Sequence, residues 1–362
     1  MADLDGPDPE GPFVLFSGHH DTWYYGVMDD GSANATMMEC ARVLAQHRAA
    51  WRRGFRLCFW SGHSHGRYSG SAWYVDHHWD ELDRRCAVHV NVDSTGGIGA
   101  SVLDESACAS ELAGLAAEVI RGETNGSHQG KRLARNSDMS FWGLGVPSMF
   151  GSLSLQPPSP AKMRNALGWW WHTPHDLLDK IDEANLVRDT RIFVAAIWRL
   201  LTDLVLPLDF AAHADALLAE LARLEASLEG AHSLASLQAA ARSLRGAASA
   251  GSGADAARVD QALMRAARAL VPVDYTSGDR FAHDSPFRRR PGRFWIRSAS
   301  WRETRGRRAV LRPWMRRGHA TGYGMHCTGP RRHCGVLDGR IGGICGAPGA
   351  MPRSRRKRDQ VI

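Results

Sequence analysis

The residues of greatest chemical interest are histidines and aspartates that follow short apolar runs. The segment "SGHHDTWYYGVMDDGSANA" (17–35) places His19 and Asp21 two residues apart, with Asp29 eight residues beyond Asp21. A histidine with a carboxylate nearby suits a metal ligand whose ring orientation is set by the acid. Asp93 in "NVDSTGG" and His172 in "WWWHTPHDLLDKID" occupy similar positions further along the chain. These residue types and their order predict a metal site.

A second group of histidines lies in "WSGHSHGRYSGS" (60–71), where His63 and His65 flank Ser64. With His65, the candidate ligands become three imidazoles and two carboxylates. If Asp29 bridges, this set suits a pair of borderline cations such as Zn²⁺. Each residue also has an ordinary structural interpretation, for example Asp29 as a helix N-cap. Their joint occurrence favours the metal site.

The elements that must position these residues are short apolar strands alternating with helices. Strands are expected at 12–18, 55–62, 87–94 and 146–150, and helical spacing covers 33–45, 70–82, 108–121 and 185–204. Strands that are apolar throughout indicate an α/β fold with a mostly parallel, twisted sheet covered by helices on both faces. In such sheets ligands bind beyond the carboxyl ends of the strands, which is where the candidate ligands lie.

The composition changes twice along the chain and predicts three segments. Residues 1–207 form the α/β domain, and residues 208–286 are rich in Ala, Leu, Glu and Arg with an amphipathic pattern, which predicts a C-terminal helical appendage suited to homodimerisation. Residues 287–362 form a basic tail that we expect to be disordered. Its Arg-Gly-Pro-Trp-Cys composition is also typical of a shifted reading frame in a GC-rich gene.

The positive charge of the chain is concentrated in the tail. Residues 287–362 contain 20 basic and 3 acidic residues, so the remaining 286 contain 25 basic and 35 acidic residues. This balance makes nucleic acid an unlikely partner except through the tail. The seven cysteines show no disulfide framework, and we find neither a signal peptide nor a membrane span, so a cytoplasmic location is expected.

Six segments in order resemble the co-catalytic zinc peptidases that include aminopeptidase Y, glutamate carboxypeptidase and the transferrin receptor. They are "GHHDTW", "GVMDDGSA", "CFWSGHSHGRYSGSAWY", "HVNVDSTGG", "SDMSFWGLGVPSM" and "WWWHTPHDLLDKID". The resemblance runs from about residue 13 to residue 206. It implies that two zinc ions bind, with His19, Asp29 and Asp93 on one and Asp29, His65 and His172 on the other.

The resemblance also implies supporting roles for three aspartates. Asp21 would orient the ring of His19. Asp176 and Asp182 match acidic positions after His172, and we expect them to cap or brace the following helix. The family begins with a helix and two edge strands that have no counterpart before residue 13, which suggests an N-terminal truncation or a misplaced start.

The departure from the family falls on its Glu-Glu pair, of which the first is the general base and the second a zinc ligand. Alignment on Gly70 and Ser71 places Ser64 at the base position and His65 at the ligand position. Imidazole is a common zinc donor, but a serine hydroxyl cannot shuttle a proton at neutral pH, and loss of a positioned acid or base typically costs about 10²- to 10⁴-fold.

Three interpretations of this loop remain open. His63 replaces the missing base, the site works through a metal-bound hydroxide alone, or the chain is an inactive family member that serves as an interaction or scaffold protein. The function that we expect is that of a zinc-dependent exopeptidase-like hydrolase, of aminopeptidase or carboxypeptidase type, acting on a small peptide or N-acyl amino acid. Trp170 and Trp171 are candidates for the wall of its substrate pocket.

Overall fold

The computed structural model describes residues 1–103, 106–124, 126–128, 137–160, 165–228, 233–249, 255–276 and 280–283. Contacts divide the chain into two units, residues 1–305 and 306–362, and every element below belongs to the first unit. The predicted basic tail (287–362) lies outside the described residues. This division does not coincide with the domain boundary that we expect at residue 207, because the first unit continues to residue 305.

The described strands form one sheet in the order β1-β3-β2-β4-β6-β5. Strands β2, β3, β4 and β6 are parallel, and the edge strands β1 and β5 are antiparallel to their neighbours. Every residue of β2 and β4 is buried, as expected for strands covered on both faces. The bounds are Ala2–Leu4 (β1), Phe13–His19 (β2), Gly54–Trp60 (β3), Cys86–Val92 (β4), Ala107–Cys108 (β5) and Ser148–Gly151 (β6).

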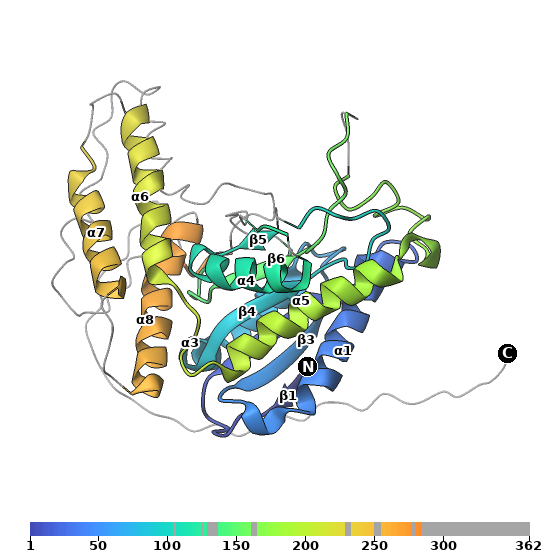
Figure 1. Cartoon of the computed structure of the whole chain (residues 1–362), viewed down its shortest axis with the longest axis horizontal. Helices are drawn as coiled ribbons and strands as arrows, with labels where there is room; N and C mark the ends of the chain where they lie inside the picture. The colour runs from blue at the N-terminus through green and yellow to red at the C-terminus, as the bar shows by residue number, and fades with distance from the viewer. Residues whose placement is uncertain are drawn as a thin grey trace, which may run out of the picture. The chain divides into compact units, whose positions relative to one another are not determined.

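Helices connect and follow the strands, which confirms the predicted α/β class (Figure 1). The α-helices are Ala33–Ala45 (α1), Ser69–His77 (α2), Trp79–Arg85 (α3), Ala113–Thr124 (α4), Glu183–Thr202 (α5), Phe210–Ser227 (α6), Ala235–Ser249 (α7) and Ala256–Tyr275 (α8). Shorter turns of helix are η1 (Val27–Ser32, a π-helix), η2 (Arg48–Ala50), η3 (Ser110–Leu112) and η4 (Leu178–Lys180). The single helix expected over 70–82 is two helices, because His78 has non-helical dihedral angles.

Alternate residues of β2 enter two separate cores, one on each face of the sheet. Val14 and Phe16 pack with α1, α4 and α5, which lie in front of the sheet in Figure 1. Phe13 and Leu15 pack on the other side with residues of α2 and α3. This period of two is the pattern of a strand between two helical layers, so helices cover both faces as the sequence predicts.

Helix α8 shares the core of the α/β part. Its apolar face contributes Met264, Ala267, Val271 and Tyr275 to the same cluster as α1, α4 and α5. Asp260 of α8 forms a buried ion pair with Arg53, which directly precedes β3. Helices α6 and α7 pair with each other, and most of α7 is exposed. The predicted helical appendage is therefore joined to the α/β part through α8 and through the start of α6, whose Phe210 lies in the same cluster.

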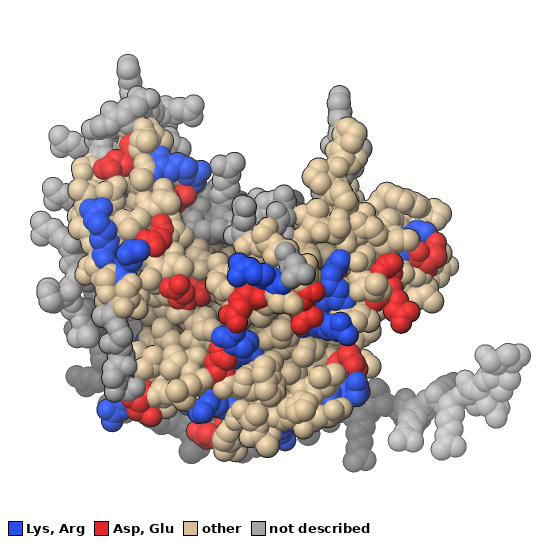
Figure 2. Space-filling view, viewed as in Figure 1, with Lys and Arg blue, Asp and Glu red and all other residues tan. Residues whose placement is uncertain are grey.

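The surface around α4 and α5 carries charges of both signs. Figure 2 shows basic and acidic residues interspersed on this face, and two of them pair as Arg199 with Glu118. Interspersed charges do not form the single-sign field that attracts a nucleic acid backbone. Of the described helices, none is long and apolar enough to cross a membrane.

Candidate metal centre

The candidate ligands lie where the parallel strands end. Strand β2 ends at His19, and Asp93 directly follows β4. These two strands are neighbours in the sheet, so their carboxyl ends meet at one edge. A side chain at Gly18 would come within 2.8 Å of the carbonyl oxygen of Val92, so glycine at this position lets the two strand ends approach closely. The pairing of β2 with β4 thus brings His19 and Asp93 together.

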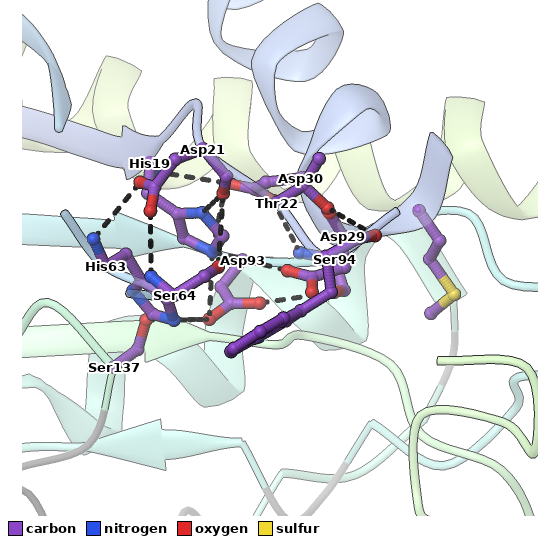
Figure 3. Close-up of polar contacts among 12 residues, drawn as sticks. His19, Asp21, Thr22, Asp29, Asp30, His63, Ser64, Asp93, Ser94 and Ser137 are labelled. Atoms are coloured by element: carbon purple, nitrogen blue, oxygen red, sulfur yellow. Dashed lines mark hydrogen bonds and ion pairs between the residues drawn. The ribbon is translucent and has the colours of Figure 1, made fainter. Parts of the chain in front are cut away.

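His19, His63 and Asp93 form a buried cluster in which their potential ligand atoms all lie within 4.8 Å of one another. His19 Nε2 lies 3.8 Å from Asp93 Oδ2, and His63 Nε2 lies 4.0 Å from the same oxygen. The two imidazole rings stack with centroids 3.6 Å apart. Figure 3 shows these three side chains pointing toward one another.

Asp29 joins this cluster to His172. Its Oδ1 lies 3.4 Å from His19 Nε2, and its Oδ2 lies 2.8 Å from His172 Nε2. One carboxylate thus faces both histidines, which is the arrangement of a bridging ligand. Asp29 does not cap α1, whose N-cap is Ser32. His172 has φ 65°, an uncommon backbone conformation for a histidine, and its ring stacks on Trp171.

Asp21 supports the site differently from the prediction. His19 Nδ1 donates to the backbone carbonyl of Asp21 at 2.7 Å, not to its carboxylate. The carboxylate instead accepts the backbone amides of His63 (3.1 Å) and Ser64 (2.9 Å). These two bonds lower the pKa of Asp21 although its burial acts in the opposite direction. Asp21 therefore both orients His19 and fixes the loop after β3.

That loop turns His63, not His65, toward the cluster. His63 is 6% exposed, whereas His65 is exposed and its ring lies 5.0 Å from that of Trp23. The predicted ligand position of His65 therefore needs correction, because the Asp21 carboxylate holds the backbone of residues 63 and 64 and leaves residue 65 outside. Ser64 is buried, and its hydroxyl donates to the Asp21 carbonyl oxygen at 3.3 Å.

The loop before β6 supplies two supporting residues that sequence reasoning missed. Asp138 Oδ2 lies 2.7 Å from His63 Nδ1, and Ser137 Oγ donates to Asp93 Oδ2 at 2.7 Å. Ser71 of α2 donates to the other oxygen of Asp138. Because a carboxylate only accepts, His63 Nδ1 donates and the lone pair of the neutral ring lies on Nε2, facing the cluster. The sequence signal was "SDMS", an acid between two serines.

Two further aspartates fix the segment that carries Asp29. Asp30 accepts the backbone amides of His19 (3.1 Å) and Ser94 (3.0 Å), and so ties together the ends of β2 and β4. Asp176 accepts the amides of Met28 (2.9 Å) and Asp29 (3.0 Å). Asp176 therefore braces η1 and not the following helix. Asp182 caps α5 by accepting the amide of Asn185, as predicted.

Of the two predicted pocket tryptophans, only Trp171 lies at the site. Its ring stacks on His172, and its Nε1 donates to Ser94 Oγ at 2.9 Å. Trp170 is 5% exposed and packs with Met28 and Leu167 in a small core of its own. The assignment of Trp170 to a substrate pocket therefore needs correction. Adjacent residues in a loop point in different directions, which the sequence does not reveal.

The ionised carboxylate of Asp93 gives the surroundings of His19 a negative potential. Although burial opposes protonation, Asp30 and Asp93 raise the pKa of His19 to about 11. Burial also acts to raise the pKa of Asp93, but its interaction with the nearby His19 and His63 rings and the hydrogen bond from Ser137 hold that pKa well below its usual range. Burial raises the pKa of Asp30 well above its usual range. Such a potential favours a cation beside His19 Nε2.

Orphaned polar atoms provide a test of whether a metal fits. Among the residues that the structure describes, His19 Nε2, His172 Nε2 and both carboxylate oxygens of Asp29 are buried without a hydrogen-bond partner. The approach of His172 to Asp29 thus lacks hydrogen-bond geometry. Buried polar groups without partners are rare and call for an explanation. Imidazole nitrogens and carboxylate oxygens are donors that Zn²⁺ prefers, so the residues fit this metal.

A mostly parallel α/β sheet that places a cluster of histidines and aspartates beyond its strand ends is a scaffold suited to metal binding. Residues 1–197 match the family described as Peptidase family M28. Because this match covers more than half of the chain, the chain belongs to peptidase family M28. This finding confirms the resemblance to co-catalytic zinc peptidases.

The chain is similar to parts of several longer proteins. It is 24% identical over 269 residues to the probable glutamate carboxypeptidase VP8 of Zea mays, covering 68% of this chain and 36% of that protein. It is 29% identical over 128 residues to the probable glutamate carboxypeptidase LAMP1 of Arabidopsis thaliana, covering 34% and 18%. It therefore spans about a third or less of the length of these relatives.

Solved structures show a partial likeness. The zinc aminopeptidase BSAP of Bacillus subtilis is 21% identical with a TM-score of 0.47, covering 56% of this chain and 49% of that one. The Legionella pneumophila aminopeptidase LapA is 21% identical with a TM-score of 0.43, covering 54% and 53%.

Proposed function

We propose that this chain is a zinc-dependent hydrolase of the exopeptidase type, which opens a peptide or related amide bond at the end of a small substrate. The observation that carries the proposal is the buried cluster of His19, His63 and Asp93 beside the Asp29–His172 pair. Several donor atoms of this group have no hydrogen-bond partner within the described part of the chain. Membership of a peptidase family supports the same conclusion.

Two zinc ions would use the ligands that the strand ends provide. His19, Asp29 and Asp93 would hold one ion, and Asp29 with His172 would hold the other. When bound, zinc polarises the carbonyl group of the scissile bond and activates water. Asp30 and Asp176 contribute by fixing the backbone beside His19 and Asp29, because their carboxylates accept the amides of these residues.

His63 would take the part of the family's missing glutamate. Its Nε2 faces the cluster, and Asp138 holds Nδ1 at 2.7 Å, so the ring presents a proton acceptor in a fixed orientation. Returning that proton to the leaving nitrogen is the step that a serine at position 64 cannot perform. Ser64 contributes to the fold of the loop through its bonds with Asp21.

A second candidate function is that of a catalytically inactive scaffold or interaction protein. The observation that favours it is the sequence His63-Ser64-His65 where the family carries its glutamate pair. Such a protein would keep the sheet and the strand-end cluster without turnover.

The zinc content of the purified full chain separates these candidates. About two zinc ions per chain, together with hydrolysis of members of a panel of aminoacyl amides and N-acyl amino acids, support the hydrolase. Less than about 0.2 zinc ions per chain after growth and purification with zinc would overturn it. If the wild type binds zinc but hydrolyses none of these substrates, and Ser64→Glu or His63→Glu restores turnover, the chain is a family member that has lost its peptidase activity.

The role of His63 is tested by His63→Ala. We expect zinc content to stay near the wild-type value while turnover falls by about 10²- to 10⁴-fold, as for the loss of a positioned acid or base. His77→Ala is the matched control, because His77 is exposed on α2 and lies outside the cluster. A loss of zinc in His63→Ala alone would instead make His63 a ligand.

A further inference from the structure

Large apolar side chains are exposed in the loops that carry or adjoin the candidate metal centre. Of the 13 large hydrophobic residues that are exposed in the described part of the chain, seven lie in three loops beyond the strand ends. They are Trp23 (39%), Tyr24 (65%), Tyr25 (71%), Ile98 (45%), Trp169 (64%), Leu177 (39%) and Leu178 (75%). We call this group the apolar rim. An exposed apolar concentration of this kind beside a polar site is typical of a ligand-binding surface.

The three loops are hydrogen-bonded into one continuous surface. The amide of Val27 donates to the carbonyl of Asp176, which joins the loop after β2 to the loop before α5. The amide of Ile98 donates to the carbonyl of Lys180, and Gly97 pairs with Ile181, which joins the loop after β4 to the same segment. The three loops that carry the apolar rim are therefore connected to one another by backbone hydrogen bonds, so its side chains belong to one surface.

Aromatic rings continue from this rim to the candidate ligands. The ring of Trp23 lies 5.0 Å from that of His65 and 6.2 Å from that of His172, tilted by 59° in both cases. On its other side His172 is stacked by Trp171. His172 Nε2 in turn lies 2.8 Å from Asp29. A group held against Trp23 would thus be placed next to the residues that bind the metal.

The charges described on the rim do not favour an ionised group. Asp179 and Lys180 pair with each other, and Lys180 also lies over the ring of Trp169. Arg67, from the same loop as His65, lies over the ring of Tyr68. Aromatic faces without an ionic partner are best suited to flat, uncharged rings.

We propose that Trp23, with His65 and the stacked Trp171–His172 pair, binds a flat, uncharged ring of the substrate beside the metal centre. The substrate class is thereby an aromatic amide or an amide of an aromatic amino acid, without a second carboxylate on the ring. That the ring belongs to a substrate rests on the proposed function. The binding of the ring itself requires neither turnover nor zinc.

The test uses three amides that the full chain, as purified, binds without needing to cleave them. 2-Naphthamide is flat and uncharged, its decahydro analogue has the same skeleton but is puckered, and 6-carboxy-2-naphthamide is flat and anionic. Dissociation constants are measured by NMR titration. We expect 2-naphthamide to bind about tenfold more tightly than the puckered amide, since a few aromatic contacts together supply this difference.

Variants assign the preference to the rim. Trp23→Ala should remove the preference for the flat ring, and Trp23→Phe should retain most of it. Trp73→Ala is the matched control, because Trp73 is also an exposed tryptophan but its ring contacts are with His77 and His78. This control should bind all three amides as the wild type does.

Two results would overturn the inference. One is tighter binding of the anionic amide than of 2-naphthamide, which would assign the rim to an acidic substrate. The other is an unchanged preference in Trp23→Ala. If the chain neither binds zinc nor hydrolyses amides but still binds 2-naphthamide through Trp23, the proposed function fails and the aromatic site stands. If hydrolysis is found without any preference for the flat ring, the proposed function stands and the aromatic site fails.

Discussion

Two buried clusters of histidines and carboxylates lie in different parts of this protein. One is the candidate metal centre, where His19 and His63 meet Asp29 and Asp93 beyond the strand ends. The other lies among helices, where His213 of α6 has Nδ1 2.8 Å from Glu111 Oε2 and Nε2 3.8 Å from Asp274 Oδ2. All three side chains of this second cluster are fully buried.

The difference between the clusters is in how their atoms are arranged. In the metal centre several ligand atoms converge on one place, and His172, with a side chain 32% exposed, borders it. In the second cluster the two nitrogens of one ring face two carboxylates on opposite sides. It joins η3 to α6 and α8, and the rings of Phe210 and Tyr275 lie beside it. Convergence indicates a binding site, whereas a bridging histidine indicates a structural tie.

The largest expected effect comes from His19→Ala. Without this ligand we expect the zinc content to fall by at least half and hydrolysis to fall at least about 10³-fold, because the metal supplies both carbonyl polarisation and water activation. Metal analysis and initial rates measure the two effects. His20→Ala, a change of the exposed neighbouring histidine, should alter neither. Equal losses of zinc and of hydrolysis in His19→Ala and His20→Ala would show that the effect is not specific to the candidate metal ligands.

His213→Ala should act on stability and not on metal binding. Removing one partner from a buried ionic group typically costs about 3–5 kcal/mol, because the other charges stay buried without compensation. Urea denaturation measures the free energy of unfolding, with the exposed His77→Ala as a control expected to stay within about 0.5 kcal/mol. A loss of zinc from folded His213→Ala would contradict the structural assignment of this cluster.

Asp138→Asn tests the support of His63 within the metal centre. The amide is uncharged and has one acceptor oxygen in place of the two that accept from His63 and Ser71, so the ring is oriented less firmly, and such changes typically cost about 10- to 100-fold. We expect kcat/KM to fall by this factor while the free energy of unfolding changes little. Ser71→Ala, which removes a hydrogen bond to Asp138, should give a smaller loss in the same direction. An unchanged kcat/KM would mean that Asp138 only fills space.

His89 offers a third environment, a buried histidine without a carboxylate. It lies between Ser17 (2.7 Å) and Ser148 (3.0 Å), and burial lowers its pKa to about 3. Because this folded-state pKa is below the unfolded value of about 6.5, the stabilising contribution is complete above pH 6.5 and is lost as the pH falls toward 3. The loss approaches about 1.4 kcal/mol per pH unit below pH 6.

The measurement is urea denaturation at pH 6 and pH 5 for the wild type and His89→Gln. The wild type should lose about 1 kcal/mol more over this interval than the variant does. If the variant does not fold, the pKa of His89 read from its ring proton shifts gives the same answer. A pKa near 6.5 would show that burial between two serines does not exclude the charged form.

The sequence by itself was sufficient for the class of fold, and it singled out most of the residues that the structure brings together in the candidate metal centre. Apolar strands followed by helices encode a parallel sheet through local periodicity, and β2 and β4 have the burial that this pattern predicts. His19 and Asp93 could be chosen because ligands in such sheets lie at strand ends, whereas His172, well beyond the end of β6 at Gly151, was chosen from its sequence motif. Asp182 could be chosen as a cap because capping depends only on the next three residues.

The tertiary structure decided which loop residues face the site. The inward position of His63 and the outward position of His65 depend on Asp21, 42 residues earlier, and on Asp138, 75 residues later. Asp176 reaches back 147 residues to the amide of Asp29. Periodicity does not encode such contacts, because a loop has no repeating direction and its side chains turn toward whichever distant hydrogen-bond partner folding brings beside them.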